Sequence, residues 1–428
     1  MTDWKALLVW RFYKSTISTH MHLLLEFGRA GGGGSSGGGG GGLIIYLFVF
    51  VAIAISWYKR RKQIKRAAKK FDEAVAQDPA WLDVVEEAKA TFIKFQSDWS
   101  DGDVTSMKAY LTADYYDHMV LVMRALKDLG RQNKMTNVVI INATIFNIDD
   151  HSSNEDDSFD IEFSASATDQ LIASDGTILL TSPPEFSEVW HFNRDGKHWL
   201  LDSIAQIGGE EMIENGYTAQ TIVADSSSPA VRMLQFANDN GFYYNYDFGW
   251  LLMPEHGLLF GVANFGRSDI NYHIIGEYLD ILVQFYEYKP VKTSASKWTD
   301  AFNWLYHPAT VGKACTVAQA TLPKHYSDIS IRRHYQPQEL LIKPSGMTRV
   351  RLEGVEFDKQ FVVYTDDVDK VHSLELLNPS FMAKLLDTPF EINVEVVDNS
   401  LYLYSFDTNA DYDVMLQLLH QAFSEMKL

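Results

Sequence analysis

The chain has 428 residues, of which 46% are hydrophobic, and is long enough for two or three domains with buried cores. Its single cysteine, Cys315, excludes a disulfide framework and fits a reducing compartment. Residues 1–70 carry 12 Lys and Arg against 2 Asp and Glu, whereas the remainder has a charge balance of −29. The acidic body argues against nucleic-acid binding, which requires cations to neutralise phosphates, and a basic stem on such a body fits an anionic membrane surface.

The first 42 residues divide into two parts. Residues 1–30 form an N-terminal segment with two open readings: it is a short interfacial helix, or Met21 is the true start. Residues 31–42 (GGGGSSGGGGGG) indicate a flexible Gly/Ser linker. A phosphate-binding loop is excluded, because no strand precedes this stretch and no Lys-Ser or Lys-Thr pair follows it.

Residues 43–58 (LIIYLFVFVAIAISWY) contain no charge and predict a single transmembrane helix, with Trp57 and Tyr58 at one interface. Sixteen helical residues span about 24 Å, less than the roughly 30 Å hydrocarbon core, and the preceding glycines can extend them. A buried core helix is one alternative. A secretion signal cleaved at Ala52-x-Ala54 is another, which the basic residues that follow disfavour.

Eight cations directly follow the apolar run: Lys59, Arg60, Arg61, Lys62, Lys65, Arg66, Lys69 and Lys70. The positive-inside rule places this side in the cytoplasm, which predicts a single-pass inner-membrane protein with residues 59–428 inside. Residues 59–78 predict a basic juxtamembrane helix that ends at Asp78-Pro79. Two readings weigh equally: the eight cations contact anionic lipid, or they are only a topology signal ahead of a solvated helix.

The period of the apolar residues changes within the next region, 79–209. Apolar residues at helical spacing from Trp81 to Trp99 predict an amphipathic helix, which Asp101-Gly102-Asp103 ends. A short helix over 107–111 and a third one to Leu129 follow, with Gly130 as its cap. Residues 138–146 then alternate with period two, and further strands are expected at 159–163, 178–180 and on both sides of the Asp195-Gly196 turn. Helices followed by an antiparallel sheet indicate a cone-shaped α+β domain.

Three stretches of this region carry a family resemblance. They are AWLDVVEEAKATFIKFQSDWSDGDVTSMKAYLTADYYDHM, LKDLGRQNKMTNVVIINATI and EVWHFNRDGKHWLLDSI. Together they resemble the Tim44-like domain over residues 78–209, and the poly-Gly stretch and membrane helix resemble its bacterial members. The resemblance implies a nuclear-transport-factor-two-like fold with protein binding or lipid contact near a membrane, and no catalysis. The chain lacks the long charged N-terminal coiled-coil region of the mitochondrial member, so a role in recruiting an import chaperone is not expected.

Six aromatic residues are candidate walls of an apolar pocket between helices and sheet: Trp81, Phe92, Tyr115, Tyr116, Trp190 and Trp199. Core packing is the more ordinary role for such residues. An enzyme or small-ligand sensor that uses this pocket is the alternative function. Near a helix start, Asp114 and Asp117 are its acid–base candidates, and Tyr115 and Tyr116 are its candidate proton donors.

A second α+β domain is expected over residues 225–428, after the boundary at Asp225–Pro229. Strands are expected at 257–265, 271–288 and 316–321, a helix that starts near Leu377-x-Pro379, and a hairpin around Asp398-Asn399-Ser400. The stretch from Thr348 onward resembles a bacterial domain of unknown function, DUF3137. That family brings no assigned chemistry.

The sequence predicts no metal site, cofactor or catalytic residue. It contains no H-E-x-x-H, C-x-x-C, G-x-S-x-G or nucleotide-binding glycine motif. The acidic turn at Asn154–Asp157 lacks the spacing of a calcium loop. The expected function is a non-catalytic protein-binding or assembly factor that is tethered to the membrane, with other proteins as partners and no nucleic acid.

Overall fold

The computed structural model describes residues 41–206, 229–244, 249–257, 259–262, 270–288, 314–334, 346–352, 355–366 and 376–426. For residues 41–57 it describes the backbone alone. The chain divides into two compact units, residues 1–62 and 63–428. The second unit contains two α+β domains, called here the cone domain (79–206) and the C-terminal domain (229–426). The predicted segments 1–30 and 31–42 lie outside the described residues, except for the backbone of the last two glycines.

Helix α2 (Gly41–Gln77) runs without a break through the apolar run and the basic stem. Among the helices whose side chains are described, none is both long and apolar enough to cross a membrane. The side chains of 43–57 are outside that set, so the transmembrane helix over 43–58 stays a prediction. The helix ends where the sequence indicates: Asp78 follows it, and the Asp78 carboxylate caps the short helix η1 (Pro79–Trp81) by accepting from the Ala80 N–H at 2.9 Å.

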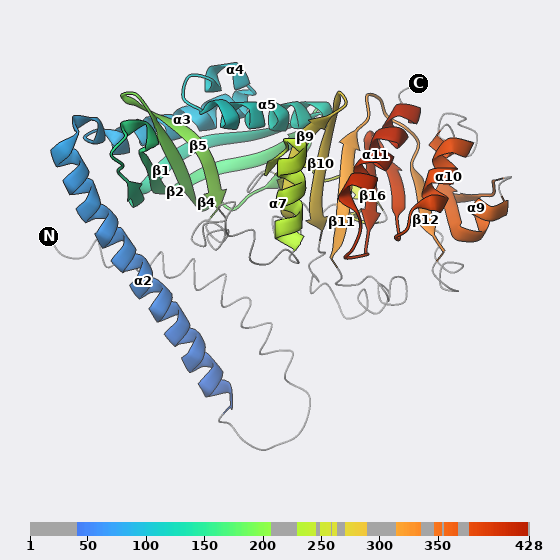
Figure 1. The fold of residues 1–428 in the computed structure, drawn as a ribbon, viewed down its shortest axis with the longest axis horizontal. Coiled ribbons are helices and arrows are strands. Elements are labelled where there is room, and N and C mark those ends of the chain that lie inside the picture. Colours follow the sequence, from blue (N-terminus) through green and yellow to red (C-terminus); the bar gives the residue numbers. More distant parts are fainter. Residues whose placement is uncertain are drawn as a thin grey trace. The chain divides into compact units, whose positions relative to one another are not determined.

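Three helices form one side of the cone domain (Figure 1). They are α3 (Val84–Asp101), α4 (Val104–Met107) and α5 (Ala113–Asp128). Gly102 ends α3 in the left-handed conformation, with φ of 71°, as the Asp-Gly-Asp break predicts. The Thr112 hydroxyl caps α5 by accepting from the Tyr115 N–H.

The sheet of the cone domain is antiparallel, in the order β1-β2-β4-β5, with β3 paired to β2. Its strands are β1 (Arg131–Asp149), β2 (Ser158–Ala173), β3 (Ile178–Thr181), β4 (Glu185–Asp195) and β5 (His198–Gln206), with η2 (Asn154–Asp156) between β1 and β2. Strand β1 has register shifts at three places, between residues 136 and 139, 140 and 142, and 145 and 147. Such bulges increase the local twist and curl the sheet. The predicted Asp195-Gly196 turn joins β4 to β5, with Gly196 at φ of 61°.

The C-terminal domain is built on a nine-stranded antiparallel sheet in the order β13-β14-β12-β15-β16-β11-β10-β9-β6, as far as its strands are described. The strands are β6 (Tyr243–Tyr244), β9 (Ile270–Tyr278), β10 (Ile281–Tyr288), β11 (Cys315–Thr321), β12 (Ile329–Arg333), β13 (Thr348–Val350), β14 (Phe361–Thr365), β15 (Asn393–Val397) and β16 (Ser400–Ser405). A separate short hairpin comprises β7 (His256–Gly257) and β8 (Gly261–Val262).

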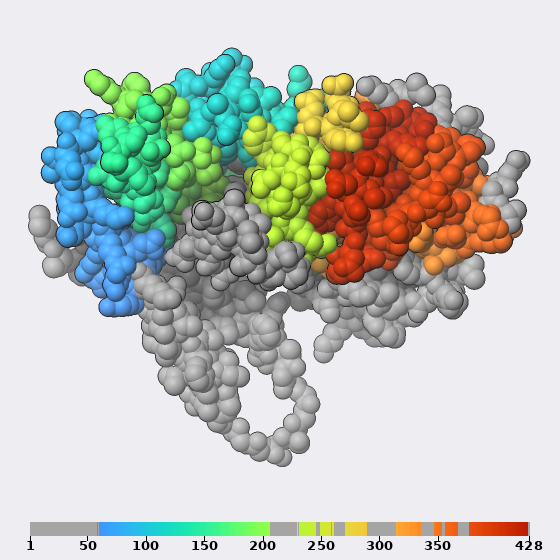
Figure 2. Space-filling model, viewed as in Figure 1, coloured from blue at the N-terminus to red at the C-terminus, as the bar shows by residue number. Residues whose placement is uncertain are grey.

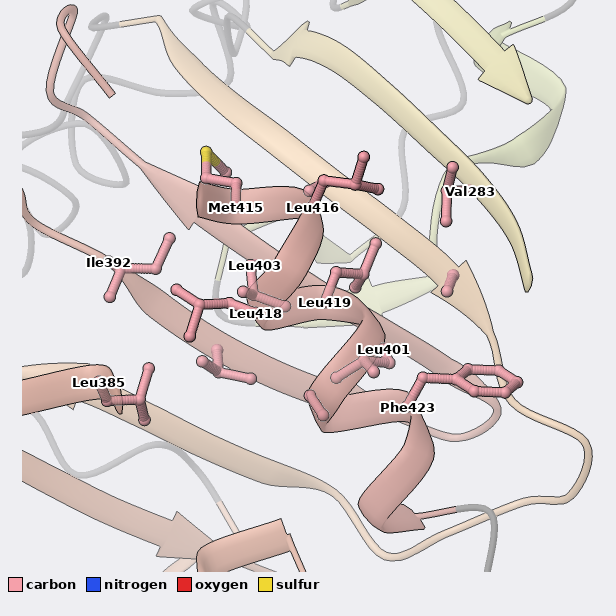
Figure 3. Close-up of a cluster of buried hydrophobic side chains, with 14 of the residues drawn as sticks. Val283, Leu385, Ile392, Leu401, Leu403, Met415, Leu416, Leu418, Leu419 and Phe423 are labelled. Carbon is pink, nitrogen blue, oxygen red and sulfur yellow. The ribbon is translucent and has the colours of Figure 1, made fainter. Parts of the chain in front are cut away.

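Helices pack against this sheet, and the main hydrophobic core of the C-terminal domain lies between these helices and the strands. The helical elements are α7 (Pro229–Asn240), η4 (Gly249–Leu252), α9 (Val355–Gln360), α10 (Pro379–Asp387) and α11 (Tyr412–Met426). Figure 3 shows α11 lying along the strands, and Leu416 and Leu419 of this helix belong to the same buried cluster as Leu401 and Leu403 of β16. A second cluster contains Tyr286, Val317 and Tyr402, which alternate along their strands with residues of the main core.

Two strand predictions in this domain were wrong. One continuous strand was expected over 257–265. In the described residues of this part of the chain there are instead two strands of two residues each, β7 and β8. The expected single strand over 271–288 is a hairpin, because Leu279 and Asp280 take positive φ (48° and 68°) and form a two-residue turn between β9 and β10. The sequence hid this turn, since Leu-Asp lacks the Asn or Gly that such turns favour. The strand at 316–321 and the hairpin at Asp398-Asn399 are confirmed.

Candidate functional site

The last turns of α2 belong to the cone domain. Ala74 is fully buried in the core of that domain, and Phe71 packs against the same core. The Lys70 ammonium donates to the carbonyl oxygen of Ile148 at 3.0 Å and lies 3.8 Å from the Asp149 carboxylate. Figure 2 shows the blue spheres of this part of α2 beside teal-green residues near 150. The last turns of α2, from Lys70 onward, are therefore fixed to the cone domain.

The other cations of the stem have a different environment. Lys65 and Lys69 are exposed and lie on the face of α2 opposite to the buried Ala67 and Ala74, as their spacing in a helix requires. Lys69 also forms a solvated i,i+4 pair with Glu73 at 3.3 Å. Of the remaining predicted lipid contacts, Arg61, Lys62 and Arg66 are exposed, Arg60 is half-buried, and the Lys59 side chain lies outside the described residues. This exposed face can approach an anionic surface, whereas Lys70 already has partners in the cone domain.

Four of the six predicted pocket residues meet inside the cone domain. Trp81 and Trp199 have ring centroids 4.5 Å apart, and Phe92 and Trp190 have centroids 4.9 Å apart. All four side chains are almost completely buried. The indole N–H of Trp190 donates to the Glu188 carboxylate at 3.0 Å, and that of Trp199 donates to the carbonyl oxygen of Ala80 at 3.3 Å. These rings occupy the space between helices and sheet by packing on one another.

The other two pocket candidates lie on α5. Tyr115 is buried beside His118, with ring centroids 5.8 Å apart, and Tyr116 is half-buried with the Lys108 ammonium 5.8 Å from its ring. Asp114 and Asp117, the acid–base candidates, are both exposed. A carboxylate in solvent does not have the apolar surroundings that this chemistry requires.

A buried junction between the two domains was missed by sequence reasoning. Trp250, Leu251 and Leu252 of η4 belong to the core of the cone domain, although they lie in the C-terminal part of the chain. The Arg131 guanidinium donates to the carbonyl oxygens of Leu251 and Met253 at 2.9 and 2.6 Å. Gln319 of β11 donates to the Leu252 carbonyl oxygen at 2.8 Å. The apolar run Trp250–Met253 was the available signal, but its partners are distant in sequence.

Two histidines are buried near this junction. The His118 ring stacks on Tyr243 with centroids 5.4 Å apart, and the His273 Nε2 lies 3.0 Å from the Gln284 side-chain oxygen. Burial lowers the pKa of His118 to about 3, with a further contribution from His273, and lowers the pKa of His273 to about 4. Both imidazoles are therefore neutral at neutral pH. Among the residues that the structure describes, no three His, Cys, Asp or Glu side chains gather as metal ligands.

An ion-pair group centred on Arg194 joins the segment just after α2 to the sheet of the cone domain. The Arg194 guanidinium lies 2.7 Å from the Asp78 carboxylate and 2.8 Å from that of Asp157. A backbone hydrogen bond from Ala80, together with Arg194, lowers the pKa of Asp78 below its usual value. This group closes the end of the cone domain where α2 joins it, which is a structural role.

The comparisons with known proteins confirm both family resemblances. Residues 62–206 match the family model of the Tim44-like domain, and residues 319–412 match that of a protein of unknown function (DUF3137). The first match begins inside α2, in agreement with the packing of that helix on the cone domain. The Tim44-like match supports a non-catalytic binding or assembly role, whereas the second family carries no assigned function. A search of the curated proteins finds no match.

Two solved structures are similar to parts of the chain. One is the crystal structure of the mycobacterial trehalose monomycolate transport factor A, TtfA, with 12% identity and a TM-score of 0.32; it covers 46% of this chain and 94% of that one. The other is the intermembrane space region of the chloroplast protein ARC6, with 9% identity and a TM-score of 0.23; it covers 28% of this chain and 95% of that one. Both TM-scores are low, so neither likeness bears on what this chain does.

Proposed function

We propose that this chain is a non-catalytic protein-binding or assembly factor, tethered by one helix to the cytoplasmic face of a bacterial inner membrane. The observation that carries the proposal is the continuity of α2. One helix holds the uncharged run 43–58 and the cations 59–70, and its last turns pack into the core of the cone domain. A membrane helix joined in this way brings the acidic body close to the bilayer. The body then presents its surface to partners at the membrane.

The division of charge supports the same reading. Residues 59–70 hold eight cations and no acid, whereas the chain as a whole has a net charge of −19. Anionic lipid attracts the stem and repels the body, which orients the body away from the bilayer surface. The family match of residues 62–206 to the Tim44-like domain supports a binding role. The close packing of Trp81 on Trp199 and of Phe92 on Trp190 favours binding at the surface over binding in a pocket that these rings would line.

Membrane fractionation tests the tether. We expect the full chain to sediment with membranes and to resist alkaline carbonate. The substitutions Phe50→Lys and Val51→Lys place two charges at the centre of the apolar run. Each charge raises the free energy of membrane insertion by about 2.5–3.5 kcal/mol, so the double variant should be released from the membrane. The matched control places the same two charges at Ser35→Lys and Ser36→Lys in the Gly/Ser linker and should remain in the membrane. A native chain that carbonate washes off would contradict the proposal.

A further inference from the structure

Residues 323–352 form a positively charged stretch within the acidic body. They contain six Lys and Arg against two Asp and Glu, a balance of +4, whereas the chain beyond residue 70 has a balance of −29. Two arginines of this stretch lie on neighbouring strands of the C-terminal domain, Arg332 on β12 and Arg349 on β13, with β14 between them. Cations that gather in an acidic protein attract anions to that place.

The register of the sheet places both arginines on the same face. Arg349 is paired with Tyr364 of β14, and Tyr364 is paired with Ser330 of β12 on its other side. Directly paired residues of antiparallel strands share a face, and so do residues two apart in one strand, which adds Arg332 to this group. The face is the one opposite to the main core, because the alternating residue Ile331 belongs to that core.

Several hydrogen-bond donors meet on this face. The Arg332 guanidinium lies 5.3 Å from the ring centroid of Tyr364, so the ring holds its orientation. The Ser330 hydroxyl and the Nε atom of Arg349 are buried, and within the described ranges of the chain neither has a hydrogen-bond partner. Burying such atoms unbonded costs free energy, which a ligand that accepts hydrogen bonds from them would recover.

The acidic residues near this group do not neutralise Arg349. Glu395 is paired with Ser330 and is almost completely buried, but its two carboxylate oxygens accept from the hydroxyls of Tyr402 and Tyr404. Asp366 follows the end of β14 and is exposed, so solvent screens its charge. The positive charge of the Arg349 guanidinium is therefore available to an anion.

We propose that this face binds a phosphate group through the guanidiniums of Arg332 and Arg349, with the Ser330 hydroxyl as a further donor. The number of donors selects phosphate over a carboxylate. The fork of one arginine satisfies the two oxygens of a carboxylate, whereas a phosphate has more oxygens and up to two charges. The backbones of β12 and β13 are two strand spacings apart, about 10 Å, which two long side chains can bridge. The phosphate belongs to a soluble ester or to a lipid headgroup.

Calorimetric titration of the full chain in detergent with inorganic phosphate tests the site. Arg349→Gln should weaken binding by about tenfold or more, because it removes charge-assisted hydrogen bonds. The control Arg124→Gln removes the same charge from an exposed pair on α5 and should keep the native Kd. A native chain that does not bind phosphate, or an unchanged Kd in Arg349→Gln, would overturn the proposal. Parallel titrations with glycerol 3-phosphate and a short-chain phosphatidic acid distinguish the two sources, since the true source should bind more tightly and depend on Arg349.

Chemical protection of the native chain keeps the test valid if the Arg349 variant does not fold. An arginine-specific dicarbonyl reagent modifies accessible guanidiniums, and peptide mass spectrometry gives the rate at each position. Inorganic phosphate should slow the modification of Arg349 several-fold and leave that of Arg124, whose side chain is 42% exposed, unchanged. Equal rates at Arg349 with and without phosphate, or equal slowing at both arginines, would contradict the site.

Discussion

Arg131, the first residue of β1, donates a hydrogen bond of 2.9 Å to the carbonyl oxygen of Leu251, 120 residues later in the chain. The Arg131 side chain is only 2% exposed and also approaches the Glu255 carboxylate at 3.5 Å. This contact holds η4 of the C-terminal domain inside the core of the cone domain. The cone domain and the C-terminal domain therefore share a core, and each contributes to the stability of the other.

Replacing Arg131 tests this dependence. Arg131→Ala leaves two buried carbonyl oxygens without their donor, and should cost about 2–5 kcal/mol of unfolding free energy. Thermal or denaturant unfolding of the full chain in detergent measures the loss. The matched control is Arg124→Ala, because Arg124 forms a solvated pair with Glu277 at 3.3 Å and such pairs contribute about 1 kcal/mol or less. Equal losses in both variants would mean that the junction contributes little.

Acid should destabilise the protein through the buried side chains of His118 and His273. Their folded-state pKa values, about 3 for His118 and about 4 for His273, lie below the unfolded value of roughly 6.5. The unfolded chain therefore binds protons first as the pH falls, and the stability present above pH 6.5 is lost toward pH 4. At pH 5 each histidine should cost about 2 kcal/mol relative to neutral pH.

Melting temperatures between pH 7 and pH 5 measure this effect. His118→Phe, which keeps a ring against Tyr243, should reduce the pH dependence by about half while retaining the fold. An unchanged slope in that variant would show that His118 titrates freely in the folded state and would contradict its burial.

The turn between β9 and β10 offers a stabilising substitution. Leu279 has a φ of 48° and is 64% exposed, so its side chain gains little from burial and its backbone is strained. Leu279→Gly should raise the unfolding free energy by about 1 kcal/mol, because glycine adopts this conformation without a steric cost. Leu82→Gly is the control: Leu82 is 63% exposed but has a φ of −62°, and it should gain nothing. A destabilised Leu279→Gly variant would point to contacts of that leucine.

Neighbouring lysines of α2 should behave differently. Lys70→Ala removes the hydrogen bond to Ile148 and should cost about 1 kcal/mol of unfolding free energy, whereas Lys69→Ala should cost less than about 0.5 kcal/mol. Charge reversal at Lys65 and Lys69 should instead weaken contact with anionic lipid. Fluorescence of a probe on α2, in vesicles with and without anionic lipid, measures that contact. The same reversals at Lys127 and Lys384, which are exposed outside α2, should have no effect.

Local patterns predicted the elements whose signals lie close together in the sequence. The amphipathic helix from Trp81 to Trp99, the Gly102 break and the Asp195-Gly196 turn all follow from spacing or turn chemistry. The β9–β10 turn escaped prediction because Leu279 is an unfavourable residue for its own conformation. The burial of Trp250–Leu252 in the cone domain and the role of Lys70 depend on partners far along the chain, which no local pattern encodes.

The measurement that tests the proposed function most directly is the side of the membrane on which the body lies. A reporter that distinguishes cytoplasm from periplasm, fused after Leu428 of the full chain, gives that answer. We predict a cytoplasmic signal, because eight cations follow the apolar run and the charged body is fixed to the same helix. A periplasmic signal would reverse the orientation and contradict a binding factor at the cytoplasmic face.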